Sequence, residues 1–385
     1  MAGVQPPIIP IIHQLIKDHP GTISLGQGVV HYGPPPSALQ AAVAFASRPT
    51  AEALADHRYG SVGGTPPLRD ALVAKLAAEN GIHVEDPREL LVSAGANMAF
   101  VNAVLAIADP GDEVILLSPY FFNHEMAVEI AGCRPVVVAT DDRHHPVVAD
   151  IERAIGPRTR AVVTNSPNNP SGAVYAEQTL AEISRLCGQR GVYHIHDEAY
   201  EYFTYGTPHF SPGSLDGVRN HTISLFSLSK SYGFASWRIG YMTMPAHLWE
   251  AVSKIQDTLL ICPPVVAEAA AVGALQAGRD YCTAQRAQTE AVRASALDAL
   301  REAEDLVDVP TAEGAFYLLL KVNAELDPME LTRLLVARHR VAVLPGTAFG
   351  LEGCYVRVSY GALSPADAAE GIGRLVEGLH AEVGR

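Results

Sequence analysis

The sequence predicts an α/β fold in which helices cover both faces of a mainly parallel sheet. From about residue 66 onward, short apolar runs alternate with longer amphipathic ones, which is the order of strands and helices in this fold class. The short runs are apolar at consecutive positions, as expected for strands that are buried on both faces. With 385 residues, 48% hydrophobic and 18% charged, the chain is long enough for a large domain with a smaller companion.

The predicted elements of the large domain begin with an amphipathic helix over residues 66–80. A strand at 90–92 and a helix over 98–108 come next. Helical segments separate several of the later strands, which are expected at 114–117, 134–138, 161–164, 192–195 and 222–225.

A smaller unit is expected toward the end of the chain. After Pro263 and Pro264 an alanine-rich helix is predicted over residues 267–300, and it could link two domains. The rest fits a small α+β domain that the N-terminal segment joins, with strands near 316–322 and 355–358 and a closing helix from Pro365. The predicted limits are 46–280 for the large domain, and 1–45 together with 281–385 for the small one.

Composition and charge exclude several classes of function. The formal net charge of -14 argues against binding to a nucleic-acid backbone, because that binding needs clustered Lys and Arg. No run approaches the roughly 20 apolar residues of a membrane span, and no basic segment precedes an apolar stretch at the N-terminus. We therefore expect a cytoplasmic protein, which also suits five scattered cysteines without a disulfide pattern: Cys133, Cys187, Cys262, Cys282 and Cys354.

Ligands of parallel sheets bind beyond the carboxyl ends of the strands, so the residues after each predicted strand are candidates. Ala96 and Asn97 follow the first strand and open a helix whose free N–H groups suit a phosphate. A tight strand–helix turn without a ligand explains them equally well. Phe121 lies in an aromatic cluster after the second strand, and core packing is its alternative explanation.

Two further strand ends carry polar side chains. Residues 164–172 contain three amides, Asn169 among them, and two prolines that hold the loop in shape, so the loop can direct donors at a ligand. Asp197 ends the strand predicted at 192–195, and Tyr200 follows three residues later. A buried carboxylate at this position needs a cationic partner.

The fifth strand end, after residues 222–225, carries the strongest signal. The chain has five lysines, and only Lys230 follows an apolar strand in a hydroxyl- and glycine-rich setting, between Ser227, Ser229 and a later Arg238. A partly desolvated lysine is nucleophilic, as Schiff-base chemistry requires. A lysine on a surface loop is the plainer alternative.

These strand ends together match the needs of pyridoxal phosphate. The cofactor needs a phosphate site, an aromatic face, amide and hydroxyl donors, a carboxylate and a lysine. Lys230 would hold it as a Schiff base, and Asp197 would keep its pyridinium nitrogen protonated so that the ring acts as an electron sink.

The motifs resemble those of the aspartate-aminotransferase-like family, fold type I of the pyridoxal-phosphate enzymes, which comprises the class I/II aminotransferases. The resemblance spans nearly the whole chain. The motifs are N-x-x-x-N-P-S-G at 165–172, D-E-A-Y at 197–200, S-x-S-K at 227–230 with Arg238 eight residues later, and Y-V-R-V at 355–358.

The resemblance implies a role for each matched residue. Phe121 would stack on the cofactor ring, while Asn169 and Tyr200 would contact its phenolic oxygen. Tyr59 resembles the tyrosine that reaches the phosphate of the partner subunit, which implies a homodimer with shared sites. The phosphate of the same subunit would be held by Ala96, Asn97, Ser227, Ser229 and Arg238.

The substrate contacts also follow from the resemblance. Arg357 would clamp the α-carboxylate of a free amino acid, with Gly28 and Asn169 beside it, although a structural salt bridge is the alternative for this arginine. An aminotransferase would pass the amino group to a 2-keto acid in a ping-pong cycle, with Lys230 as the acid–base group. This is the leading hypothesis.

One departure from the family pattern suggests a second hypothesis. Residues 28–32 read Gly-Val-Val-His-Tyr where related aminotransferases commonly carry G-x-P-D-F. The stretch is also similar to pyridoxal-phosphate enzymes that oxidise or hydroxylate L-arginine with O₂, in which a histidine near the substrate matters. His31 would be that histidine near the substrate. The alternative is that it is an ordinary loop residue. Against this hypothesis, the sequence shows no clear acidic pair to hold a guanidinium, and Asp18 and Glu201 are no more than candidates.

A metal-dependent hydrolase is a third and remote hypothesis. His194 and His196 form an H-x-H pattern that points two imidazoles to one face of a strand, and His144 and His145 lie in a nearby stretch. The pattern explains neither Lys230 nor the amide-rich loop, so we expect no metal site.

Overall fold

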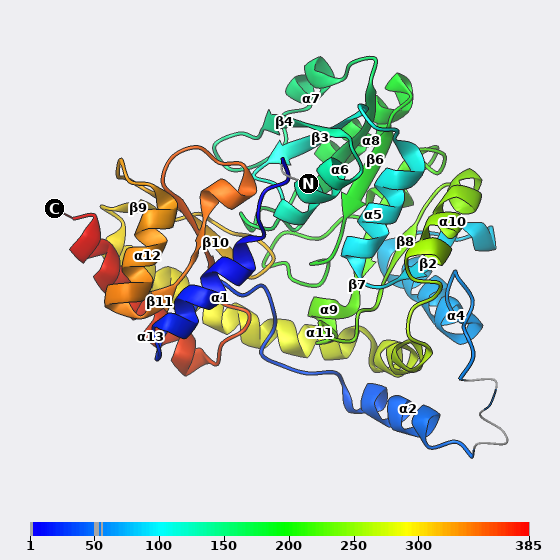
Figure 1. Cartoon of the computed structure of the whole chain (residues 1–385), viewed down its shortest axis with the longest axis horizontal. Coiled ribbons are helices and arrows are strands. Elements are labelled where there is room, and N and C mark those ends of the chain that lie inside the picture. The colour runs from blue at the N-terminus through cyan, green and yellow to red at the C-terminus, as the bar shows by residue number, and fades with distance from the viewer. Residues whose placement is uncertain (1–2, 50–53, 55–56, 385) are drawn as a thin grey trace.

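A seven-stranded sheet forms the centre of the protein (Figure 1). The computed structural model describes residues 3–49, 54 and 57–384. Within them, the order of strands across this sheet is β2 (Leu90–Ser93), β8 (Gly240–Thr243), β7 (Thr222–Ser227), β6 (Tyr193–Asp197), β5 (Thr159–Asn165), β3 (Glu113–Ser118) and β4 (Arg134–Ala139).

The sheet is parallel except at β8. Strands β4, β3, β5, β6 and β7 pair in parallel, and β8 runs antiparallel to both β7 and β2. Because β8 is reversed, β2 still runs in the direction of the other strands. The carboxyl ends of six strands and the beginning of β8 therefore meet at one edge, and the predicted mainly parallel α/β sheet is confirmed.

Apolar side chains cover both faces of this sheet, as the consecutive apolar positions predict. Leu91 of β2 packs on the face covered by three helices, while its neighbours Leu90 and Val92 pack on the opposite face. The first face is covered by α5 (Ala96–Ile107), α6 (Phe122–Ile130) and α10 (Trp249–Leu259). The second is covered by α4 (Pro66–Lys75), α11 (Val265–Leu300), α7 (Val148–Ala154) and α8 (Glu177–Arg190).

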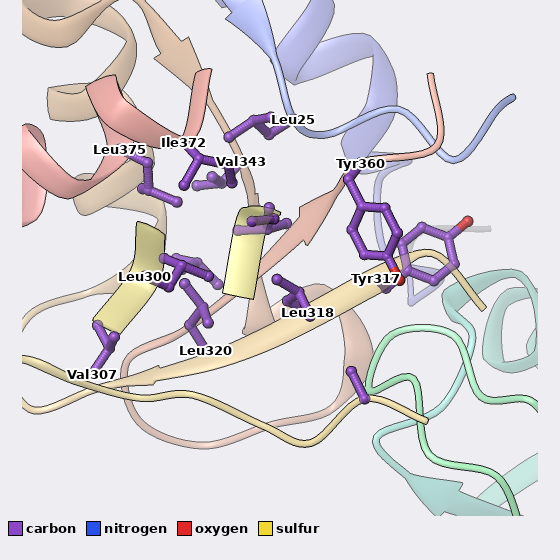
Figure 2. Close-up of a cluster of buried hydrophobic side chains, with 14 of the residues drawn as sticks. Leu25, Leu300, Val307, Tyr317, Leu318, Leu320, Val343, Tyr360, Ile372 and Leu375 are labelled. Carbon is purple, nitrogen blue, oxygen red and sulfur yellow. The ribbon is translucent and has the colours of Figure 1, made fainter. Parts of the chain in front are cut away.

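A four-stranded antiparallel sheet forms the small α+β domain. Its strand order is β12 (Leu344–Pro345), β13 (Tyr355–Ser359), β10 (Tyr317–Val322) and β9 (Val307–Asp308), and α12 (Pro328–His339) and α13 (Pro365–Glu382) pack with it. Figure 2 shows its core, in which Leu25 of the N-terminal segment lies with Val343 and Ile372. The segment also adds β1 (Ile23–Ser24), which pairs with β11 (Val341–Ala342).

The two helices of the N-terminal segment pack in different places (Figure 1). Helix α1 (Ile8–Asp18) buries Ile12 against Val336 and Leu344 of the small domain. Helix α2 (Pro36–Ala46) packs Ala38 into the cluster that covers the second face of the central sheet. The domain limits at residues 45 and 280 remain predictions. None of the helices in the described ranges combines the length and apolarity needed to cross a bilayer.

Helix α11 bends at Gly278, near the limit predicted between the domains. Gly278 has φ 64° and ψ -163°, a backbone conformation that is essentially restricted to glycine. A Cβ atom added there would meet nothing within 4 Å, so only the backbone conformation requires a glycine.

We predict that Gly278→Ala lowers the free energy of unfolding by about 1–3 kcal/mol, the cost of one strained residue. Gly373→Ala in α13 is the matched control, because its Cβ atom also meets nothing within 4 Å and its φ lies outside the left-handed region. The control should gain up to about 1 kcal/mol from helix propensity. Urea denaturation of both variants measures the difference, and equal effects would contradict the explanation.

Candidate active site

A cavity of about 450 Å³ lies at the carboxyl edge of the central sheet and extends to the small domain. Residues that follow β2, β3, β5, β6 and β7 meet there, as the parallel topology requires. Most of the predicted site residues line it: Gly28, Ala96, Asn97, Phe121, Asn169, Asp197, Tyr200, Ser227, Ser229, Lys230, Arg238 and Arg357.

Lys230 lies in the short helix α9 (Leu228–Ser231) directly after β7. Its Nζ atom donates a hydrogen bond to the carbonyl oxygen of Gly28 at 2.5 Å. Burial lowers the pKa of Lys230 to about 8, and the charges of Arg238 and Arg357 act in the same direction, while Asp197 opposes them. A minority of the amine, far larger than for an ordinary lysine, is therefore unprotonated at neutral pH.

The reversed strand β8 brings Arg238 to the same edge. Gly240, the first residue of β8, pairs with the last residue of β2 and of β7, so the preceding residues lie at the cavity. The guanidinium of Arg238 donates to Ala94 O at 3.1 Å and to Ser229 Oγ at 3.5 Å. A Cβ atom on Gly95 would lie 2.3 Å from Arg238 Nη2, so this close approach requires a glycine.

The beginning of α5 completes this part of the cavity. Gly95 is its N-cap and has φ 81°, and the first N–H groups of a helix have no partner within it. Ala96 and Asn97 supply these groups next to Arg238. Together they provide N–H donors and a positive charge, which suit a phosphate.

Asp197 is held from two sides at the end of β6. Its Oδ1 atom accepts a hydrogen bond from Ala199 N at 3.0 Å, and its Oδ2 atom lies 3.1 Å from His124 Nε2. The His124 ring stacks on Phe100 at 4.2 Å and meets Phe121 edge-on at 5.3 Å. This packing fixes both the imidazole and the carboxylate.

Arg357 reaches the cavity from β13 of the small domain and is only 2% exposed. It donates to Asn169 Oδ1 at 2.9 Å and to Gly26 O at 2.6 Å, and its Nε atom has no partner. Its guanidinium lies 4.4 Å from the ring centre of Tyr317. Among the described residues no carboxylate pairs with Arg357 or Arg238, so both sites favour an anionic ligand.

Hydroxyl groups connect the two domains beside Arg357. Asn169 Nδ2 donates to Tyr200 OH at 3.4 Å, and the hydroxyls of Tyr200 and Tyr317 lie 2.7 Å apart. Burial raises the pKa of Tyr200 well above its usual value, with the neighbouring Tyr317 as the next cause. The hydroxyl of Tyr200 therefore remains protonated and can donate.

Two predicted site residues lie outside the walls of this cavity. His31 contacts Gln288 Oε1 at 3.2 Å and Gly361 O at 3.4 Å, so within this chain its ring does not face Lys230. Tyr59 is 80% exposed and lines a separate surface hollow with Phe45 and Leu260.

Several cavity residues were missed in the sequence analysis. His13 comes from α1 and Tyr317 from β10, and neither belongs to a motif at a strand end. His124 contacts Asp197 but lies 73 positions away from it in the sequence. Contacts of this range have no local signal, although an imidazole near a functional carboxylate is a common arrangement.

The two histidines of the H-x-H pattern are part of the buried core. Thr164 Oγ1 lies 2.7 Å from His194 Nε2 and 2.6 Å from His196 Nδ1, and burial lowers the pKa of His194 to about 3. Within the described ranges no three His, Cys, Asp or Glu side chains are arranged to hold a metal ion. The structure gives no support to the hydrolase hypothesis.

Known proteins resemble the chain over nearly its whole length. The family Aminotransferase class I and II matches residues 20–375. An aromatic aminotransferase of Arabidopsis thaliana is 34% identical, covering 98% of this chain and 94% of that protein. The aspartate/prephenate aminotransferase of Thermus thermophilus is 37% identical over 79% of this chain and 78% of its own. A solved single mutant of Thermus thermophilus aspartate aminotransferase superposes with a TM-score of 0.89 at 32% identity and 98% coverage of both chains.

The fold and the buried lysine at the sheet edge define an enzyme of the fold type I class. More narrowly, the chain belongs to the class I and II aminotransferase family and is an aminotransferase. The family and the fold predicted from the motifs are confirmed. The relatives named above are all aminotransferases, so the comparisons do not support the alternative of an L-arginine oxidase.

The lowered pKa of Lys230 predicts the pH at which its amine reacts. In protein freed of carbonyl compounds, reductive methylation of Lys230 should increase with pH with a midpoint near pH 8, because only the unprotonated amine reacts. Arg238→Gln should move the midpoint to higher pH by removing one repelling charge. Peptide mass spectrometry measures both midpoints, and a wild-type midpoint near the usual lysine value of about 10.4 would contradict the prediction.

Proposed function

We propose that this aminotransferase binds pyridoxal phosphate in the cavity at the sheet edge and transfers the amino group of a free L-amino acid to a 2-keto acid. One observation carries the proposal: Lys230, with a pKa lowered to about 8, shares a cavity with Arg238 and Arg357, which have no carboxylate partner among the described residues. A nucleophilic amine with two separate anion sites suits an aldehyde phosphate and a carboxylate substrate.

The residues around Arg238 fit the cofactor phosphate. The guanidinium, the hydroxyls of Ser227 and Ser229 and the first N–H groups of α5 face one space, which Gly95 keeps open by lacking a side chain. Donors of this kind bind a phosphate dianion through charge-assisted hydrogen bonds.

The residues around Asp197 fit the cofactor ring. Asp197 would hold a proton on the ring nitrogen, and its contact with His124 fixes the position of the carboxylate. Phe121 would lie against the ring, while Asn169 and Tyr200 would donate to its phenolic oxygen. When bound, the cofactor supplies an electron sink for the charge that develops at the substrate Cα.

Arg357 and Lys230 would have different roles toward the substrate, one in binding and one in proton transfer. Arg357 would bind the α-carboxylate, since its guanidinium is fixed by Asn169 and Gly26 and retains an unpartnered Nε–H. Lys230 would first hold the cofactor, then yield this place to the substrate amine and accept the proton from Cα. It would then pass that proton to the cofactor carbon, after which water would release the 2-keto acid. The relatives named above include an aromatic and an aspartate/prephenate aminotransferase, so they do not identify one substrate.

The ping-pong cycle predicts a single turnover in the absence of an acceptor. With an L-amino acid alone, the holoenzyme should release one 2-keto acid per site and stop, and adding 2-oxoglutarate should restart turnover. Lys230→Ala should slow the proton transfer by about 10²–10⁴-fold, the usual contribution of an acid–base group. Stopped-flow absorbance and keto-acid assays measure these steps. Sustained oxygen consumption without a keto acid would contradict the proposal and favour an oxidase.

We further propose that the enzyme is a homodimer with shared sites. Tyr59 and the hollow beside it lie among exposed apolar side chains, which mark interaction surfaces on proteins. Val266 lines the hollow, and Val43, Leu259 and Ile261 are exposed apolar side chains within two positions of residues that line it. Tyr59 would reach the phosphate of the partner subunit from this surface.

Shared sites predict complementation between two defective variants. Lys230→Ala removes the lysine, and Tyr59→Phe should weaken cofactor binding by about 10- to 100-fold through loss of a hydrogen bond to a charged group. Mixed dimers of the two variants would contain one intact site, so a randomly reassorted mixture at limiting cofactor should reach about a quarter of native activity. The same variants mixed without subunit exchange are the control. Activity no greater than that control would contradict shared sites.

A further inference from the structure

One wall of the cavity has no part in holding the cofactor or the α-carboxylate. It lies where α1, the N-terminal segment and the beginning of α6 meet. We call it the distal wall, and it consists of Ile9, His13, Gln27, Val29, Phe122 and Asn123.

Helix α1 presents two of these residues on one side. Ile9 and His13 are four positions apart, which places them on the same face of a helix. Ile12 anchors the helix in the small domain, and Gln5 binds Glu125 of α6 at 2.7 Å. The distal wall is therefore held against both domains.

Gln27 fixes the orientation of His13. Its Nε2 atom lies 2.9 Å from His13 Nε2, and with the amide in this orientation Gln27 donates and the imidazole accepts. A ring that accepts at Nε2 is neutral and carries its proton on Nδ1. In this arrangement the Nδ1 atom of His13 is the one left to donate to a ligand.

The position of Gln27 relates the distal wall to the reacting atoms. Its neighbour Gly26 accepts a hydrogen bond from Arg357, and its neighbour Gly28 accepts one from Lys230. Ser359 donates to the carbonyl oxygen of Gln27 itself at 2.6 Å. A substrate placed between Arg357 and Lys230 thus has its side chain next to the Gln27–His13 pair.

The charges around the cavity argue against an acidic side chain. The lysine and arginine side chains that line it are Lys230, Arg238 and Arg357, and each already has a role. The distal wall offers apolar surface, two amides and one imidazole. A second carboxylate placed there would have no free lysine or arginine partner among the described residues, whereas an uncharged ring would contact apolar groups and meet a donor at its edge.

We propose that His13, oriented by Gln27, is a specificity-determining residue of this aminotransferase. It would select amino acids whose uncharged aromatic side chain ends in a hydrogen-bonding group, such as a phenol, over dicarboxylic amino acids. The inference rests on the proposed function, because it requires the α-carboxylate to bind at Arg357.

The test compares L-tyrosine, L-phenylalanine and L-aspartate in the first half-reaction of the holoenzyme. Wild type should favour tyrosine over phenylalanine by about two- to tenfold, the range of one neutral hydrogen bond, and should use aspartate least. His13→Phe keeps the ring and removes the donor, so the ratio of tyrosine to phenylalanine should fall to about one. The loss should appear as weaker tyrosine binding, with the rate at saturation unchanged.

Two further variants keep the test decisive. Gln14→Ala lies on the same helix, where Gln14 bonds Asp18 at 2.8 Å, and should leave all three substrates unchanged. His13→Asn retains a donor and should keep part of the tyrosine preference. This variant therefore tests the role of the donor even if His13→Phe does not fold.

Three results would overturn the inference. One is an equal loss for all substrates in His13→Phe, which indicates a structural role. Another is an unchanged ratio of tyrosine to phenylalanine. The third is a wild-type preference for aspartate, as a cation from the partner subunit would produce. In each case one keto acid per site still forms without oxygen uptake, whereas failure of the proposed function would appear as no keto acid from any amino acid or as sustained oxygen consumption.

Discussion

Three consecutive carbonyl oxygens of the N-terminal segment hold the two halves of the active site together. Gly26 O accepts from Arg357 of the small domain, Gln27 O accepts from Ser359 of the same strand, and Gly28 O accepts from Lys230 at the end of a large-sheet strand. The segment has little freedom, because a Cβ atom on Gly28 would lie 2.5 Å from the hydroxyl of Tyr317. The relative position of lysine and arginine, on which any reaction between them depends, is therefore set by a backbone that belongs to neither strand.

The cationic side chains that line this cavity outnumber its one carboxylate. Lys230, Arg238 and Arg357 line it with Asp197, and the charges of the two arginines help to lower the pKa of the lysine. Arg357 is buried there without a carboxylate partner among the described residues, and such a cation lowers the stability of a fold. Anions that bind only the folded protein recover stability in proportion to their affinity. The arrangement therefore favours two anionic ligands and also provides the unprotonated amine, so affinity and reactivity have the same electrostatic cause.

The sequence predicted the fold and the strand ends because each depends on local signals. Consecutive apolar residues identified strands such as β7, and the polar residues after them were candidates because parallel topology gathers strand ends. Strand β8 was not predicted, yet its reversal places Arg238. His31 contacts Gln288 and Gly361, whereas the adjacent Tyr32 donates to Lys230 O at 2.8 Å, because neighbouring side chains in an extended segment point to opposite sides.

Cofactor contacts and side-chain contacts in this cavity come from different parts of the chain. The residues that fit the cofactor follow strands of the central sheet, where a shift of one side chain would disturb the packed core beneath it. The distal wall comes largely from α1 and the segment after it, and α1 is anchored through Ile12 in a small separate cluster. Substitutions on the exposed face of α1 can therefore change which side chain fits while Arg238, Asp197 and Lys230 keep their positions. This separation explains why motifs at strand ends identify the reaction class, whereas the substrate depends on residues that carry no motif.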